Sequence, residues 1–178
     1  PEEVSVVSSD AEWVNIGYRL PGVAADDMFM LPLLNSLLFN GQAGLMDLDL
    51  IKSQKILSAY AYGDVNRDYA TFQLSGNPRE GQKLEEVKDL LIAEIEKLKK
   101  GEFEDWMLPA AIKNFKLEDR QNNLYNSSRA YKMTNAFILG QQWSDVVNAN
   151  AKLEKVKKQQ MVDFANKYLK NNYVVVYK

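Results

Sequence analysis

The amino-acid sequence predicts an α+β fold in which helices pack on one face of a mostly antiparallel sheet. Period-two alternation marks strands early in the chain and again in its middle, and apolar stripes with helical spacing follow both regions. The sequence then closes on a strand rich in valine and tyrosine. The 178 residues, 46% of them hydrophobic, suffice for one domain with a sizeable core.

Two strands are predicted first, at Ser5–Ser8 and Trp13–Leu20. In the second strand every even-numbered residue from Val14 onward is apolar, which is typical of a strand with one buried face. Pro21 and Gly22 end this strand, because both residues favour turns.

A helix is predicted to open at Asp26 and Asp27, since acidic residues in a first turn suit the helix dipole. Its single apolar stripe consists of Met30, Leu33, Leu34, Leu37 and Leu38. Gly41 ends the helix, and a second, short helix is predicted at Leu45–Ile51.

A hairpin follows, with strands at Ile56–Tyr62 and Tyr69–Ser75 joined through the turn residues of "GDVNRD". A strong amphipathic helix then runs from about Leu84 to Leu98 and closes at Gly101. Further helices are predicted around Leu108–Phe115, from Ser128 to Leu139, at Trp143–Val147 and around Met161–Leu169, before a closing strand at Tyr173–Tyr177.

The composition excludes several classes of site. The chain has no cysteine and no histidine, which excludes thiolate zinc sites, a histidine zinc site and a serine triad. The net charge of -2 gives no reason to expect nucleic acid as a partner. No apolar run is long enough to span a bilayer.

Two acidic groups have structural explanations. Asp47 and Asp49 form a D-x-D pair, but the remaining ligands of a calcium loop are missing, so both are interpreted as polar positions on a short surface helix. Glu85, Glu86 and Asp89 cluster in the first turns of a helix, where the helix dipole accounts for them.

Gly41 and Gly44 are interpreted as a helix stop and a tight turn, because no phosphate-loop pattern accompanies them. Asn126-Ser127-Ser128 is a formal glycosylation acceptor of a kind that is common by chance. No catalytic residue and no metal ligand is therefore assigned in this chain.

The candidates for contact with a peptide are Lys52, Lys55, Tyr60 and Tyr62. An edge strand with tyrosines and basic residues can receive an extended peptide by strand addition. The alternative is a half-buried strand with amphipathic side chains, and the sequence leaves both interpretations open.

Three segments in a fixed order carry a resemblance to a known family. They are "WVNIGYRLPG" with its continuation to "SAYAY", then "GNPREGQKLEEVKDLLIAEIEKLKKGEFED", and finally "VKKQQMVDFANKYLKNNYVVVYK". Together they resemble the insulinase/pitrilysin family of zinc metallopeptidases, whose fold is shared by mitochondrial processing peptidase and the complex III core proteins. The resemblance covers essentially all 178 residues.

The resemblance implies a non-catalytic role. The family is built from repeated domains of one fold, and only one of them carries the zinc motif H-x-x-E-H. Residues 1–178 would then be a single non-catalytic domain, excised from a longer chain that begins before Pro1. Zinc is expected in the parent's catalytic domain and no cofactor in this chain. The implied partners are the sister catalytic domain and the parent's peptide substrate.

This sequence departs from the family pattern at one place. In some family members an arginine stands seven residues before a tyrosine, and the pair contacts substrate. Ser53 stands seven residues before Tyr60, and Lys55 stands seven before Tyr62, so neither tyrosine has an arginine fork. This departure favours a structural role over direct clamping of substrate.

Three hypotheses follow. In the first, the chain is a non-catalytic structural and substrate-chamber domain of a zinc-dependent endopeptidase. In the second, it is a peptide-binding or assembly scaffold of the core-protein type, with no peptidase in the parent. The third is an independent hydrolase that uses carboxylates. Because many bacterial family members are exported, the family suggests the periplasm or cell envelope, with the cytoplasm as the alternative.

Overall fold

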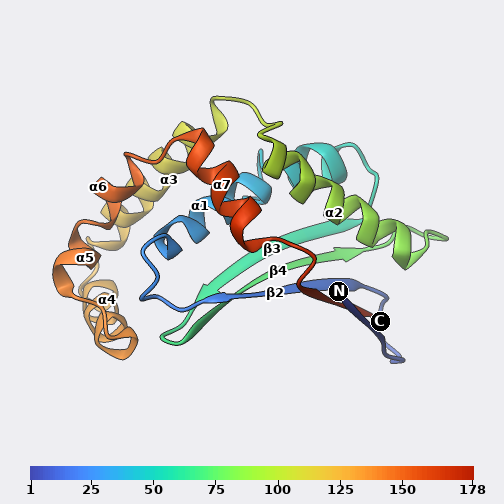
Figure 1. Cartoon of the computed structure of the whole chain (residues 1–178), viewed down its shortest axis with the longest axis horizontal. Coiled ribbons are helices and arrows are strands. Elements are labelled where there is room, and N and C mark those ends of the chain that lie inside the picture. The colour runs from blue at the N-terminus through green and yellow to red at the C-terminus, as the bar shows by residue number, and fades with distance from the viewer.

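The computed structural model describes all residues 1–178 and contains one five-stranded sheet (Figure 1). Its strands are β1 (Glu2–Ser5), β2 (Val14–Pro21), β3 (Ser58–Val65), β4 (Tyr69–Asn77) and β5 (Tyr173–Tyr177). They lie in the order β1-β5-β2-β4-β3. Every pair is antiparallel except β1 with β5. The predicted α+β class with a mostly antiparallel sheet is confirmed.

Helices cover one face of this sheet, and the other face is open (Figure 1). They are α1 (Leu31–Leu38), α2 (Leu84–Lys100), α3 (Met107–Asn122), α4 (Asn126–Leu139), α5 (Trp143–Val147), α6 (Ala149–Leu153) and α7 (Lys158–Tyr168), together with a 3-10 turn η1 (Met28–Met30) and a π-helix η2 (Asp47–Lys52). α1 and α2 contact the sheet directly, whereas α4, α5 and α6 lie to one side of it. None of the helices is long and apolar enough to cross a bilayer.

The first predicted strand, Ser5–Ser8, is wrong. The strand at this end is β1, and it pairs in parallel with the last strand, with Glu2 opposite Val174 and Ser5 opposite Tyr177. This pairing joins the two ends of the sequence, so no local pattern near Ser5 could specify it. The short helix α6 was also not predicted.

The hairpin is shifted relative to the prediction. β3 begins at Ser58, two residues later than expected. Ile56 does not pair with a strand, because its side chain is buried and its backbone nitrogen donates to the carbonyl oxygen of Leu50 in η2, 3.5 Å away. The strand then continues through Gly63 to Val65, although these residues were assigned to the turn. A Cβ at Gly63 would lie 3.0 Å from Cγ of Leu31, so the missing side chain leaves room for helix α1.

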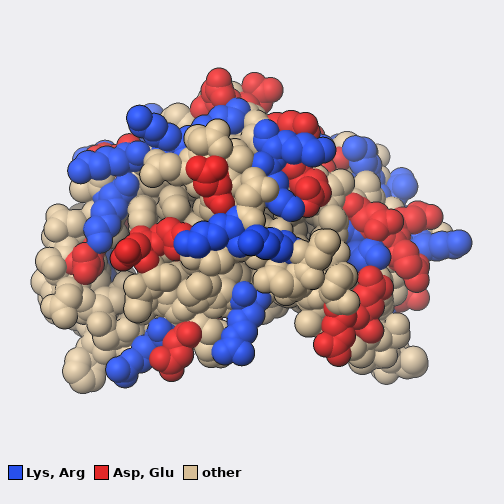
Figure 2. Space-filling model, viewed as in Figure 1, with Lys and Arg blue, Asp and Glu red and all other residues tan.

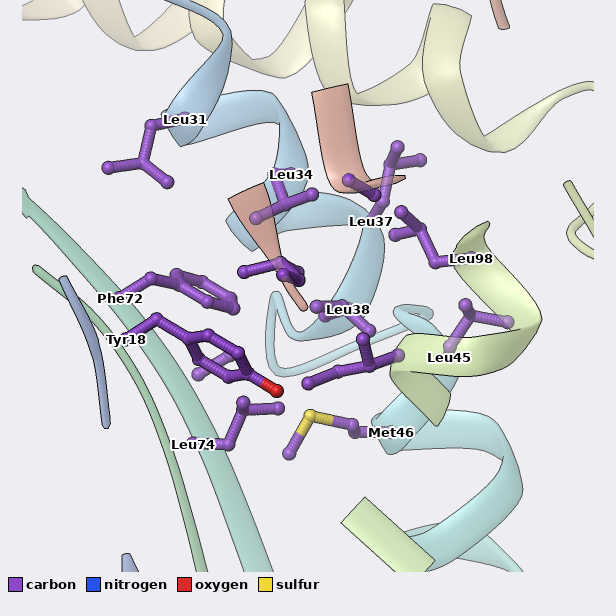
Figure 3. Packing of buried hydrophobic residues seen from close by; sticks show 14 of the residues in the cluster. Tyr18, Leu31, Leu34, Leu37, Leu38, Leu45, Met46, Phe72, Leu74 and Leu98 are labelled. Carbon is purple, nitrogen blue, oxygen red and sulfur yellow. The ribbon is translucent and has the colours of Figure 1, made fainter. Parts of the chain in front are cut away.

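The core lies between the sheet and the helices that cover it. In β2 the side chains alternate between buried and accessible, as predicted, and Tyr18 points into the core beside Phe72 of β4 (Figure 3). The predicted stripe of the first helix is buried and meets these rings, with Leu34, Leu37 and Leu38 on α1 (Figure 3). One cluster of 36 buried residues results, with members from Val14 in β2 to Tyr177 in β5.

Asp47 is not a surface position, contrary to the prediction. Its side chain is buried, and Oδ2 accepts hydrogen bonds from the backbone N–H groups of Asn40 at 3.0 Å and Gly44 at 2.9 Å. Gly44 fits the predicted tight turn, since a Cβ there would lie 2.6 Å from the carbonyl oxygen of Leu38. Gly41 has a φ of +76°, which suits the predicted helix stop. Asp47 therefore holds the loop between α1 and η2.

Glu94 is a second buried carboxyl group, on the inner side of α2. Its Oε1 accepts a hydrogen bond from Lys97 Nζ at 2.8 Å, and Oε2 has no partner. Lys97 also pairs with Asp49 at 2.7 Å. Burial raises the pKa of Glu94, and the neighbouring ammonium group opposes this shift only in part.

The raised pKa of Glu94 predicts how stability depends on pH. The protonated Glu94 carboxyl group is favoured more in the folded protein than in the unfolded chain. Its contribution to the free energy of unfolding is therefore fully present below its ordinary pKa of 4.5. This contribution is lost as the pH rises through the pKa of the folded state. Glu94→Gln is therefore expected to raise the unfolding free energy at pH 7 and to flatten its fall above pH 4.5.

Urea unfolding at several pH values measures this effect. Glu96→Gln is the control, because Glu96 lies on the same helix with its side chain 46% exposed, and it should change stability by no more than about 0.5 kcal/mol. A Glu94→Gln protein that is less stable than the wild type at pH 7 would contradict the prediction.

Candidate peptide-contacting edge strand

The two edges of the sheet differ in length and charge. β1 has four residues, and two of them are acidic. Glu3 is held by the hydroxyl of Tyr177 at 2.8 Å and by Lys88 at 3.3 Å. β3 has eight residues and no proline, and Asp64 near its end is its one charged residue. Short, charged edges resist pairing with another chain, whereas long uncharged ones invite it. β3 is therefore the edge suited to receive a strand.

β3 has a hydrogen-bonded neighbour on one side only. Its partner is β4, with Ser58 opposite Asn77 and Val65 opposite Ala70. The backbone donors and acceptors that point away from β4 have no strand partner. An extended peptide could pair with them and become a sixth strand.

Tyr60 and Tyr62 stand two residues apart on this strand, so both point to the same face of the sheet. Ala59 and Ala61 alternate with them and are buried under the helices. The tyrosines therefore project toward the open face, where they are 54% and 62% exposed. β3 thus has one buried and one exposed face, which fits both the half-buried strand and the peptide-contacting edge that the sequence left open. The ring of Tyr60 also packs edge-on against Phe39, with centroids 5.4 Å apart.

Lys52 and Lys55 do not lie on the strand. Lys52 is the last residue of η2, and its Nζ donates a hydrogen bond to the carbonyl oxygen of Gln42 at 2.6 Å. Lys55 is exposed in the connection to β3, and its own carbonyl accepts a hydrogen bond from Gln82 Nε2 at 3.0 Å. The structure thus groups the two tyrosines and places the two lysines ahead of the strand.

The open face beside the tyrosines is polar. Arg19 of β2 stacks over the ring of Tyr69 with its guanidinium 5.4 Å from the centroid, and Asn15 donates to Gln73 at 3.5 Å. A Cβ at Gly17 would meet nothing within 4 Å, so the surface is shallow there. Sequence alternation placed these β2 residues on one face but could not show that this face lacks covering helices.

The carboxylates do not form a metal site. Nowhere in the chain do three or more Asp, Glu, His or Cys side chains come together as a group that could hold a metal ion. Glu85, Glu86 and Asp89 are exposed in the first turns of α2, as the helix-dipole interpretation predicted. What the structure offers at this edge is unpaired backbone along β3 and two exposed tyrosine rings.

The fold and this site define a non-catalytic domain of the metallopeptidase type. Residues 1–115 match the family described as the inactive domain of M16 peptidases. The chain therefore belongs to this family, and the resemblance to the insulinase/pitrilysin peptidases is confirmed. Over 161 residues, 90% of the chain, it is 26% identical to "Zinc protease PqqE" of Helicobacter pylori.

Solved structures agree on the fold. A protease from Helicobacter pylori superposes with a TM-score of 0.91 at 22% identity, covering 99% of this chain and 43% of that one. An inactive peptidase domain from Bordetella parapertussis gives a TM-score of 0.84 at 16% identity, covering 97% of this chain and 92% of that one. A chain of complex III from Candida albicans gives a TM-score of 0.80 at 10% identity, covering 99% of this chain and 45% of the matched one.

The chain is shorter than most of these relatives. It spans 36% of the length of the Helicobacter pylori zinc protease and 43% of the solved protease chain. The Bordetella domain, by contrast, has nearly the same extent. The two Helicobacter pylori chains, however, continue well beyond the region that matches.

Proposed function

We propose that residues 1–178 form the non-catalytic, peptide-contacting domain of a longer zinc-dependent endopeptidase. A sister domain of the same parent carries the zinc and the H-x-x-E-H motif, and this chain holds no cofactor. The observation that carries the proposal is the long edge of β3, uncharged from Ser58 to Gly63, with Tyr60 and Tyr62 exposed on it. The family membership supports the proposal, since a relative of the chain is a zinc protease.

In this proposal the domain holds a peptide in an extended conformation while the sister domain cleaves it. Backbone pairing along β3 supplies affinity without selecting a sequence. The tyrosines supply apolar surface with a polar tip, which suits contact with varied side chains. The lysines need not clamp the substrate, because Lys52 is bound to its own loop. The periplasm or cell envelope remains the expected compartment.

The test is peptide hydrolysis by the intact parent protein. Tyr60→Ala together with Tyr62→Ala is expected to raise KM for an unstructured peptide by about tenfold, because two aromatic contacts near 0.7 kcal/mol each are lost. Bound zinc should not change. Trp106→Ala is the matched control, since Trp106 is 51% exposed at the start of α3, and it should leave KM unchanged.

A second measurement separates strand addition from side-chain docking. The same peptide with alternate backbone nitrogens methylated keeps its side chains but loses the donors that pair with β3. As a competitor of substrate hydrolysis, this methylated peptide should be much weaker than the unmodified peptide. Equal competition, or a KM untouched by the tyrosine substitutions, would contradict the role of the edge strand.

The scaffold hypothesis is decided outside this chain. If the coding sequence of the parent contains H-x-x-E-H in a domain of similar fold, the protein is a peptidase. If the motif is missing throughout, the chain belongs to an assembly or peptide-binding scaffold.

A further inference from the structure

Helix α4 is oriented opposite to an ordinary surface helix. A surface helix buries its apolar stripe and exposes its polar one. In α4 the least exposed residues follow one stripe that is largely polar, namely Ser128, Lys132, Asn135, Ala136 and Leu139. Only Ala136 among them is buried. The apolar side chains point outward instead.

The outward side chains are large. Tyr131 is 73% exposed, Met133 56%, Phe137 87% and Ile138 60%. Leu124 and Tyr125, in the turn before the helix, are 77% and 63% exposed. On α5, Trp143 is 45% exposed and Val147 is 58% exposed. We call these eight residues the α4 surface. Figure 2 shows the corresponding region, at the lower left, as a mostly uncharged part of the molecule.

The domain's own core does not hold α4 in place. No residue of α4 or α5 belongs to the 36-residue core cluster. The inner side of α4 buries Ala136 alone, and the one ion pair from α4 to another helix joins Lys132 Nζ to Asp119 at 2.7 Å. An isolated helix of 14 residues is marginal in water. Apolar burial against something outside residues 1–178 would supply the missing stabilisation.

We propose that the α4 surface is the docking face for another folded domain of the same parent polypeptide. The proposal rests on the proposed function, which places this chain in a longer protein. The length of the relatives supports this occupant, because more than half of the Helicobacter pylori protease chain lies outside the region that matches. An uncharged aromatic surface is typical of the centre of a protein interface.

A membrane surface fits the α4 surface less well. Helices that lie on membranes carry lysine and arginine along the border of their apolar face. The one exposed base of α4 is Arg129, and its guanidinium donates to the carbonyl of Asn123 at 3.0 Å and to the side chain of Asn126. The border of the surface therefore offers little attraction to anionic lipid.

The experiment uses the intact parent protein with a specific protease site placed between residues 1–178 and the remainder of the chain. After cleavage, the two pieces of the wild type should elute together in size-exclusion chromatography. The variant with Met133→Glu and Phe137→Glu should release residues 1–178, with the dissociation constant raised at least about tenfold. Leu57→Glu together with Trp106→Glu is the control, since it adds the same two charges at side chains that are 68% and 51% exposed outside the α4 surface, and it should not separate the pieces.

Folding of the variant is checked by the thermal unfolding of residues 1–178 alone. Both substituted side chains are exposed, so the midpoint should match that of the wild type. Pieces of the wild type that separate, or variant pieces that stay together, would overturn the proposal. So would a concentration-dependent dimer of residues 1–178 that the same variant abolishes, because the occupant would then be a second copy.

The outcome is independent of the peptide-binding role. Loss of association in the Met133→Glu and Phe137→Glu variant tests docking, whereas the tyrosine substitutions on β3 test peptide contact. A parent without the zinc motif would end the peptidase proposal and leave the docking result intact.

Discussion

Phe72→Ala is expected to destabilise the domain by about 3–5 kcal/mol, because it removes a fully buried ring from the centre of the sheet. Phe72 lies on β4 between Tyr18 of β2 and Gly63 of β3, and its ring faces the leucines of α1 (Figure 3). The free energy of unfolding in urea measures the loss.

The control for Phe72 is its neighbour on the same strand. Gln73 points to the open face, so Gln73→Ala should change stability by no more than about 0.5 kcal/mol. If Phe72→Ala proved as mild as Gln73→Ala, the core would not lie where the structure places it.

Gly22→Ala is expected to cost about 3 kcal/mol or more, since the added Cβ would collide with backbone. It would lie 2.2 Å from the carbonyl oxygen of Arg67 and 2.6 Å from the carbonyl carbon of Asp68. These atoms belong to the β3–β4 turn, and the N–H of Val23 bonds to Asn66 in the same turn. Relief of the clash therefore requires the hairpin to move away from β2.

Gly17 provides the matched control five residues earlier on β2. A Cβ there would meet nothing within 4 Å, and alanine is less costly than glycine inside a strand. Gly17→Ala should therefore leave stability unchanged or raise it slightly. Thermal unfolding of both variants decides the matter, and equal destabilisation at the two glycines would contradict the close approach at Gly22.

The helices and most strands could be predicted from local patterns. Alternation in β2 and the apolar stripe of α1 are signals that lie within a few residues of each other, and both are confirmed. The closing strand Tyr173–Tyr177 was predicted with the bounds that the structure gives. β1 could not be predicted in this way, because its place depends on β5 at the other end of the sequence.

The site was predictable in part. Alternation put Tyr60 and Tyr62 on one face, but that β3 is an edge follows from the strand order of the whole sheet. Burial of Asp47 could not be foreseen, because its partners are backbone N–H groups, which every sequence has. The reversed orientation of α4 had a visible signal in Phe137 and Ile138, large apolar residues at the end of a helix whose other stripe is polar.

The position of β5 sets the order in which the sheet can form. β5 lies between β1 and β2, and it is the only strand that β1 contacts through hydrogen bonds. A ribosome releases Tyr173–Tyr177 after all the other elements, so the growing chain holds β2, β3 and β4 with one side of β2 still unpaired. Until then β1 has nothing to join. Within residues 1–178, β1 is therefore synthesised before the other strands but can take its native place only after β5 has been made.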